Sequence, residues 1–437
     1  MRGEAVEAHH AAAGRLIERL AHEQALALLD RALKLAEEPK DFARVETMIG
    51  LIRARNAQGD LAWEHRLRAL DWHTRAGQTA PASLYADLLE IPAFNFGYYR
   101  RLPDEREVLR LMAEGERVAR VSGDEVALAR LLTHRAVFDR DHEASAEALA
   151  IVEAATDPAP YAEAFHRLAM AQFLGGDIAQ ARSLFDRCLD RLLATGARVN
   201  EPEALTFRTL LIFHLGDLAR AESMADRVLE ISAQRSPHTE SHALGVRALV
   251  QFGRGDWPGV SRTASQIADL VGRHPEATWC LIGAAPAWQG AVADVLAGRG
   301  LPQGAVDLVS RMVPNSAKVQ ASSLMILRIM AGMPWSETEA LAAYAPNARF
   351  WDTQEWWDPC SLHLALAYAL LRRWDDLERM LPKFDELAAK GAALLGAFAA
   401  AVREQIAADR GGPVPAHREL RALGYLGLSE LLSYQPH

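Results

Sequence analysis

The feature of this sequence that most constrains its fold is a short corner that recurs about every 40 residues. Each copy reads Phe, two residues, Gly-Asp and then an apolar residue, with the aspartates at Asp177, Asp217 and Asp256. The two spacings are 40 and 39 residues. Self-similarity at such a period is typical of stacked helical or strand-containing units, each of which needs its neighbours to cover its apolar face.

The segment after each corner has the periodicity of a helix. After Asp177, apolar residues fall at Ile178, Ala181, Leu184, Phe185, Cys188, Leu189 and Leu192. The same offsets follow Asp217 and Asp256. Spacing by three and four predicts a one-faced helix, because a strand would alternate by two. We expect the glycine to end a first helix and the aspartate to begin a second one by accepting hydrogen bonds from free N–H groups.

The same period extends over most of the chain. Asp60 lies 117 residues before Asp177, and Asp376 lies 120 residues after Asp256. Weaker turn signals fill the gaps near residues 21–22, 102–104, 141–142, 298–300 and 332–334. We therefore predict an all-α, right-handed α-solenoid of about ten helical hairpins over residues 1–410. Residues 411–437, which begin at a Gly-Gly-Pro sequence, are expected to form a short C-terminal helical appendage.

These hairpins resemble the tetratricopeptide repeat (TPR). The matching residues are Gly176, Asp177, Ile178, Ala181, Phe185 and Cys188. The period is nearer 40 than the 34 residues of that family, and its first-helix Leu-Gly pair is Leu168-Ala169 here. Longer repeats of this kind are similar to the helical sensor region of bacterial ATPase-linked transcription activators and adenylate cyclases. The segment 417–432 is similar to the tails of the cyclase-linked group.

That resemblance implies a bacterial, cytoplasmic, regulatory or signalling protein, either alone or as part of a longer one. The composition agrees: 43 arginines against five lysines are typical of a GC-rich genome. Three widely separated cysteines, Cys188, Cys280 and Cys360, form neither a metal knuckle nor an even disulfide set, which favours a reducing compartment. The first residues lack the apolar core of a signal peptide.

Charge and hydropathy argue against two classes of partner. The net charge of −9 gives no strong positive field for a phosphate backbone, so we expect no nucleic-acid partner, and helical-repeat RNA binding is an alternative that the charge disfavours. The longest apolar run, residues 391–402, has 12 residues, fewer than the roughly 20 that a membrane span needs. We predict that this run is a buried helix and that the chain has no membrane partner.

Chemical motifs are missing from the sequence. It contains no phosphate loop, no Gly-x-Ser-x-Gly, no His-Glu-x-x-His and no Cys-x-x-Cys, so we predict no catalytic residue and no cofactor. His238 and His242 lie one helical turn apart and could share a metal ion. The favoured alternative is a helix that starts after Pro237 with polar residues facing water, so no metal site is predicted. Residues 139–143, also rich in acids and histidine, are interpreted as a solvated turn.

Three arginines form the first candidate binding site. Arg167, Arg208 and Arg247 precede their Asp anchors by 10, 9 and 9 residues, so three successive first helices would present a ladder of guanidinium groups. In tetratricopeptide arrays the first helices line the concave groove, and arginine there can bind carboxylates or phosphates. The alternative is that these arginines pair with acidic neighbours such as Glu163, Glu203 and Glu240.

The second candidate is a tryptophan-rich segment, residues 349–359. Trp351, Trp356 and Trp357 lie beside Asp352 and could enclose a cationic or sugar-like ligand, or contact a protein partner. Packing between neighbouring hairpins is the favoured alternative for these rings.

The sequence thus favours a non-enzymatic binding or regulatory module that recognises a protein, a peptide or a small effector in the groove of a TPR-like solenoid. The alternative is an enzyme or biosynthetic accessory protein with a pocket in the C-terminal half. Self-association as a homodimer stays open.

Overall fold

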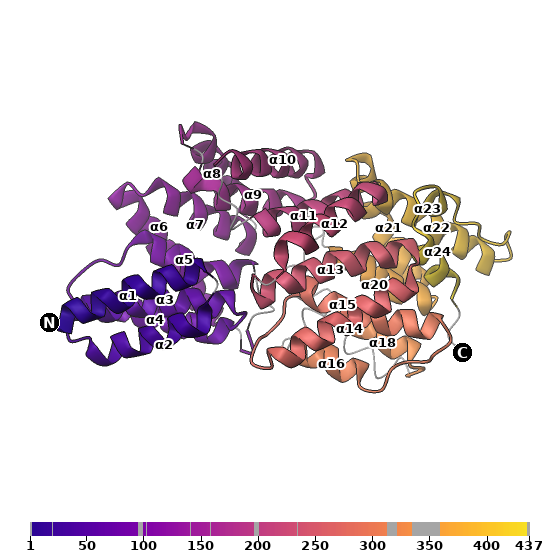
Figure 1. Ribbon diagram of the computed structural model, residues 1–437. Coiled ribbons are helices and arrows are strands. Elements are labelled where there is room, and N and C mark those ends of the chain that lie inside the picture. The colour runs from indigo at the N-terminus through magenta and orange to yellow at the C-terminus, as the bar shows by residue number, and fades with distance from the viewer. Residues whose placement is uncertain are drawn as a thin grey trace. The chain divides into compact units, whose positions relative to one another are not determined.

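Every regular element that the structure describes is a helix (Figure 1). The computed structural model describes residues 2–19, 21–94, 99–101, 103–139, 141–157, 159–195, 201–233, 235–312, 321–333 and 359–434. The chain divides into two compact units. Unit 1 comprises Met1–Arg167 with the short stretches Gln234–His238 and Glu276–Thr278, and unit 2 comprises Leu168–Ala233, Thr239–Pro275 and Trp279–His437.

Unit 1 is built from consecutive helical hairpins. Its helices are α1 (Arg2–Glu18), α2 (His22–Leu35), α3 (Pro39–Arg55), α4 (Gly59–Arg75), α5 (Ala82–Phe94), α6 (Glu105–Ser122), α7 (Glu125–Phe138), α8 (His142–Ala154), the 3₁₀ turn η2 (Ala159–Tyr161) and the first part of α9 (Ala162–Leu174). Helices α1, α3, α5 and α7 are followed by partners that pack against them. The first helices α5 and α7 also contact each other, as stacked hairpins require.

Unit 2 continues the pattern over the rest of the chain. Its helices are α10 (Ile178–Thr195), α11 (Glu201–His214), α12 (Leu218–Ser232), α13 (Pro237–Arg254), α14 (Trp257–Arg273), α15 (Leu281–Leu296), α16 (Ala305–Met312), α18 (Ala321–Met330), α20 (Pro359–Leu370), α21 (Trp374–Ala389), α22 (Ala393–Asp409), α23 (Arg418–Ala422) and α24 (Leu426–Ser433). Both units are thus stacks of hairpins, and the prediction of an all-α solenoid fold is confirmed.

The Gly-Asp corners have the predicted structure. The glycines have φ of 78° at Gly176, 86° at Gly216 and 76° at Gly255, a left-handed conformation that side chains other than glycine resist. Each following aspartate then caps a helix. The Oδ1 atoms of Asp177, Asp217 and Asp256 accept hydrogen bonds of 3.0–3.1 Å from the N–H three residues later.

The packing around the corners is also as expected. Ala181 and Ala221, four residues after their aspartates, are completely buried. Phe173, Phe213 and Phe252 lie in the core at no more than 2% exposure. Small alanines let two helices approach closely, while the phenylalanine rings fill the space on the other side of each corner.

At two more distant corners the predicted capping aspartate is wrong. Asp60 and Asp376 lie two and three residues after the observed N-caps. Helix α4 begins at Gly59, so Asp60 lies inside the first turn, and its carboxylate accepts the backbone N–H groups of Arg100 and Arg101 instead. The left-handed residue of that corner is Ala57. In the same way, the corner before α21 places Arg372 in the left-handed conformation and leaves Asp376 within the helix.

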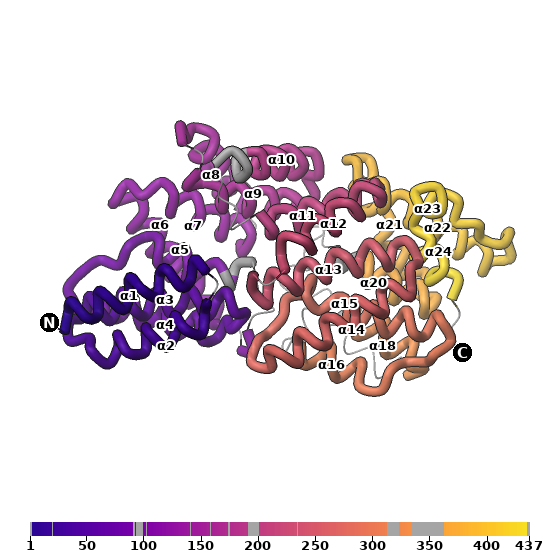
Figure 2. The backbone as a smooth tube through the Cα atoms, viewed as in Figure 1, coloured from indigo at the N-terminus to yellow at the C-terminus, as the bar shows by residue number. Residues whose placement is uncertain are grey.

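The C-terminal helices fold back over the corners of unit 2 (Figure 2). A Cβ built on Gly176 would lie 2.9 Å from Leu387 of α21, one on Gly216 would lie 3.1 Å from Ala393 of α22, and one on Gly255 would lie 3.3 Å from the backbone of Gly427 of α24. Residues from three later helices therefore cover three successive corners.

Tyr425 anchors this fold-back. Its ring is fully buried and packs edge-on against Phe213, with the ring centroids 5.0 Å apart, and its hydroxyl donates to the Phe213 carbonyl. The segment 411–437, predicted as an appendage, thus packs into the core of unit 2 through its described residues. Helix α22 is buried along Leu394–Val402, as predicted for the longest apolar run. In the described part of the chain, no helix combines the length and apolar character needed to span a bilayer.

Candidate functional site

Arg167 lies in a buried network of charges in unit 1. Its guanidinium contacts Glu90 of α5 at 2.5 Å. Arg130 of α7 lies beside them and binds Asp87 at 2.7 Å and Glu163 of α9 at 3.1 Å. The side chains of Arg130 and Arg167 are only 11% and 9% exposed. The network connects three successive first helices, α5, α7 and α9, through opposite charges.

The pKa values show how closely these groups are coupled. Burial raises the pKa of Glu90, but the guanidinium groups of Arg167, Arg130 and Arg66 outweigh burial and lower it to about 2. Burial and the nearby Glu90 raise the pKa of Glu163. Because a buried charge that loses its partner is costly, this network holds the first helices in register.

Arg208 and Arg247 are placed differently, on the surface of unit 2. Arg208 of α11 pairs with Asp186 of α10, and Arg247 of α13 pairs with Asp226 of α12. Each arginine therefore binds an aspartate on the second helix of the preceding hairpin. The arginine side chains keep 21% and 35% exposure. The acidic partners are not the glutamates that the sequence alternative named.

The tryptophan-rich segment falls outside the described residues. Trp351, Trp356, Trp357 and Asp352 are all in the range 334–358, so their role as a binding site stays a prediction. Two other tryptophans of the C-terminal half, Trp279 and Trp288, are core residues at 1% and 0% exposure.

A cluster that the sequence analysis had not assembled lies where α13 packs against the start of α15. Glycines allow this close approach: a Cβ on Gly245 would lie 2.2 Å from the carbonyl oxygen of Ile282, and one on Gly283 would lie 2.5 Å from Ser241 Oγ. Cys280 precedes α15 as its N-cap, and its sulfur accepts a hydrogen bond from the Gly283 N–H at 3.4 Å. The thiol is therefore held at a helix start that faces α13.

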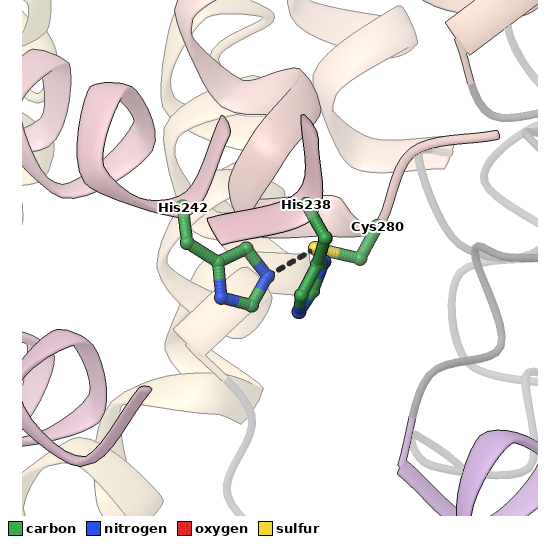
Figure 3. Close-up of side chains that lie close together, drawn as sticks. All are labelled: His238, His242 and Cys280. Carbon is green, nitrogen blue, oxygen red and sulfur yellow. Dashed lines mark hydrogen bonds between the residues drawn. The ribbon is translucent and has the colours of Figure 1, made fainter. Parts of the chain in front are cut away.

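The imidazoles of His242 and His238 meet this sulfur (Figure 3). His242 Nε2 lies 2.7 Å from Cys280 Sγ, and His242 Nδ1 lies 3.0 Å from Glu203 Oε2 of α11. His238 is one turn earlier on α13, and one donor atom from each histidine and the sulfur lie within 4.8 Å of one another. Burial lowers the pKa of His242, but the neighbouring Cys280 and Glu203 outweigh it and raise the pKa to about 10.

The expectation for this segment is partly wrong. Helix α13 does begin at Pro237, but His242 is 2% exposed and does not face water. Sequence reasoning missed Cys280 and Glu203 because it searched for ligands close together along the chain. Cys280 and Glu203 are separated from His242 by 38 and 39 residues, which matches the repeat period and places them side by side on successive hairpins. Within residues 139–143, Asp139 is the C-cap of α7, Asp141 caps α8 through the Ala144 N–H, and His142 and Glu143 already belong to the first turn of α8.

Comparison with known proteins does not place this chain in a family. No protein-family model matches the sequence, and no curated protein matches it. Among solved structures, the chain is similar to the TPR domain of P58(IPK), with 12% sequence identity, coverage of 77% of this chain and 98% of that chain, and a TM-score of 0.22.

Proposed function

We propose that the chain is a binding module and that Arg208 and Arg247 capture acidic groups of a protein or peptide partner on the first helices of unit 2. The observation that supports this most is their equivalent placement: they lie 39 residues apart, on α11 and α13, and both are partly exposed. Two guanidinium groups repeated at hairpin spacing suit a partner that carries two or more carboxylates.

The present partners of these arginines are exchangeable. Asp186 and Asp226 are 41% and 57% exposed, and an ion pair at such a surface contributes about 0–1 kcal/mol. An incoming carboxylate can therefore replace the aspartate at little cost.

Arg167 would contribute in another way. Its guanidinium is committed to Glu90 in the buried network, and removing it would leave a buried carboxylate with less compensation. We therefore assign partner contact to Arg208 and Arg247, and assign to Arg167 the role of holding the first helices in place.

The test measures binding of fluorescent peptides rich in Glu and Asp by anisotropy, with Lys-rich peptides of equal length as a specificity control. Arg208→Glu and Arg247→Glu should each weaken binding of the acidic peptides about tenfold or more, because each replaces attraction by repulsion. Arg220→Glu, at an exposed position of α12, is the matched control and should bind like the wild type.

A further variant should change the affinity for the acidic peptides in the opposite direction. Asp226→Ala removes the internal competitor of Arg247, so it should strengthen binding of the acidic peptides. Equal binding by wild type, Arg208→Glu and Arg247→Glu would remove the two arginines from the partner surface.

A further inference from the structure

The geometry points to a zinc site formed by His238 and His242 of α13 and by Cys280 at the N-cap of α15, with Glu203 supporting it from α11. This site is separate from the arginine surface proposed above. Two imidazole nitrogens and a thiolate are donors that Zn²⁺ prefers, whereas Mg²⁺ and Ca²⁺ prefer oxygen. The structure brings these three donors together from positions up to 42 residues apart in the sequence.

The arrangement has the second contact that bound histidines need. In metal sites, a ligating histidine donates its other ring N–H to a carboxylate, which fixes the tautomer and turns the remaining nitrogen toward the ion. Glu203 Oε2, 3.0 Å from His242 Nδ1, is in this position. The nitrogen turned toward the cluster is then Nε2, the atom that faces the Cys280 sulfur.

The backbone also fixes the thiol. Cys280 is the N-cap of α15 and is nearly buried, so its sulfur is directed at α13 and not at solvent. His238 and His242 project from the same face of α13 because they are four residues apart. Three donors are thus carried by two helices whose close approach is permitted by Gly245 and Gly283.

The spacing fits an ion after a small adjustment. Donors around a tetrahedral zinc lie about 3.5 Å apart, given zinc bonds of roughly 2.0–2.3 Å to nitrogen and sulfur. The 2.7 Å between His242 Nε2 and Cys280 Sγ must therefore open by about 1 Å, which a rotation of the cysteine side chain provides. Among the described residues the group has three donors, and zinc with three protein ligands keeps its fourth position for water or a bound molecule.

The experiment uses the full chain, stripped of metal by a chelator and then titrated with Co²⁺ and Zn²⁺. We expect one equivalent of Co²⁺ to bind with a thiolate-to-cobalt charge-transfer band, and Zn²⁺ to displace it and raise the thermal midpoint. Cys280→Ser should remove the band, and His242→Gln and His238→Gln should weaken binding at least a hundredfold. Glu203→Gln should weaken it about tenfold, as expected for a supporting carboxylate.

Matched controls keep the test independent of folding. Cys188→Ala removes another buried thiol and His142→Gln an exposed histidine, and both should bind Co²⁺ like the wild type. Circular dichroism checks the helical content of every variant. The charge-transfer band is measured on the wild-type chain, so that part of the test does not depend on whether a variant folds. No bound cobalt, or cobalt bound without the thiolate band, would overturn the zinc site. Rapid alkylation of Cys280 that zinc does not slow would also overturn it and would favour a Cys-His nucleophile.

Discussion

Individual buried histidines make the stability of unit 2 sensitive to acid. His214 of α11 is 2% exposed and packs edge-on against Phe213, with its Nδ1–H donating to the Leu210 carbonyl at 2.7 Å. Burial lowers the pKa of His214 to about 4, although the bond to Leu210 opposes this. His363 of α20 has its pKa lowered to about 4 by burial and by His214. Protonating either ring therefore opposes folding.

The first prediction concerns the pH dependence of His214. Since its folded pKa lies below the ordinary 6.5, the unfolded chain binds more protons between about pH 6.5 and 4, and stability falls as the pH falls through this window. The full shift corresponds to about 3 kcal/mol. His214→Gln should remove that loss, as measured by urea unfolding at pH 7 and pH 4.5.

The exposed His142→Gln should keep the acid sensitivity of the wild type. If His214→Gln lost as much stability between pH 7 and 4.5 as the wild type does, the depressed pKa of His214 would be refuted.

At the scale of the elements, the corners show what the sequence could and could not predict. Gly176, Gly216 and Gly255 were identifiable because only glycine takes the left-handed conformation freely. Ala57 and Arg372 adopt that conformation although they are not glycine. The sequence pattern therefore predicted the nearby Asp60 and Asp376 as the corner residues. A Gly-Asp pattern cannot locate a corner whose left-handed residue is not glycine.

The candidate sites, too, could be predicted only in part from the sequence. The arginines were predictable as a periodic set, but their partners were not, since Asp186, Asp226 and Glu90 lie on other helices. Periodicity alone also does not distinguish the buried Arg167 from the partly exposed Arg208 and Arg247. The His-Cys cluster required comparing equivalent positions of successive hairpins, at separations of 38 and 39 residues, where no short motif exists.

The second prediction tests helix packing at a corner. Ala221 of α12 is fully buried four residues after Asp217, so Ala221→Trp forces a large ring into a close helix contact. We expect a loss of about 1–3 kcal/mol in the free energy of unfolding, measured with urea. Ala219→Trp, at an exposed position of the same helix, should leave stability close to wild type. Unchanged stability in Ala221→Trp would contradict the assigned repeat register.

At the scale of the molecule, unit 2 departs from an open stack. In a simple repeat array each hairpin contacts only its neighbours, and stability is a sum of local terms. Here α22 contacts α11, and α24 contacts α20, although long stretches of chain separate them. The described C-terminal residues thus add contacts that connect early and late hairpins of this unit, which should make its unfolding more cooperative.

The third prediction tests this closure through Tyr425. Tyr425→Ala removes the ring packed on Phe213 and its hydrogen bond to the Phe213 carbonyl, so it should cost about 3–5 kcal/mol. Because the tyrosine connects distant hairpins, far-UV circular dichroism and tryptophan fluorescence should report the same lowered urea midpoint for unit 2. Tyr434→Ala, at a partly exposed position, is the control. A small, local effect of Tyr425→Ala would show that the tail merely rests on the surface.

The covered corners have a consequence for how this unit can vary in length. Leu387, Ala393 and Gly427 lie against the glycines of three consecutive hairpins. Insertion or deletion of a single hairpin between α9 and α14 would move at least one of those glycines away from its counterpart. The number of hairpins in unit 2 is therefore set by its own C-terminal segment, unlike that of an open array, which can grow or shrink one copy at a time.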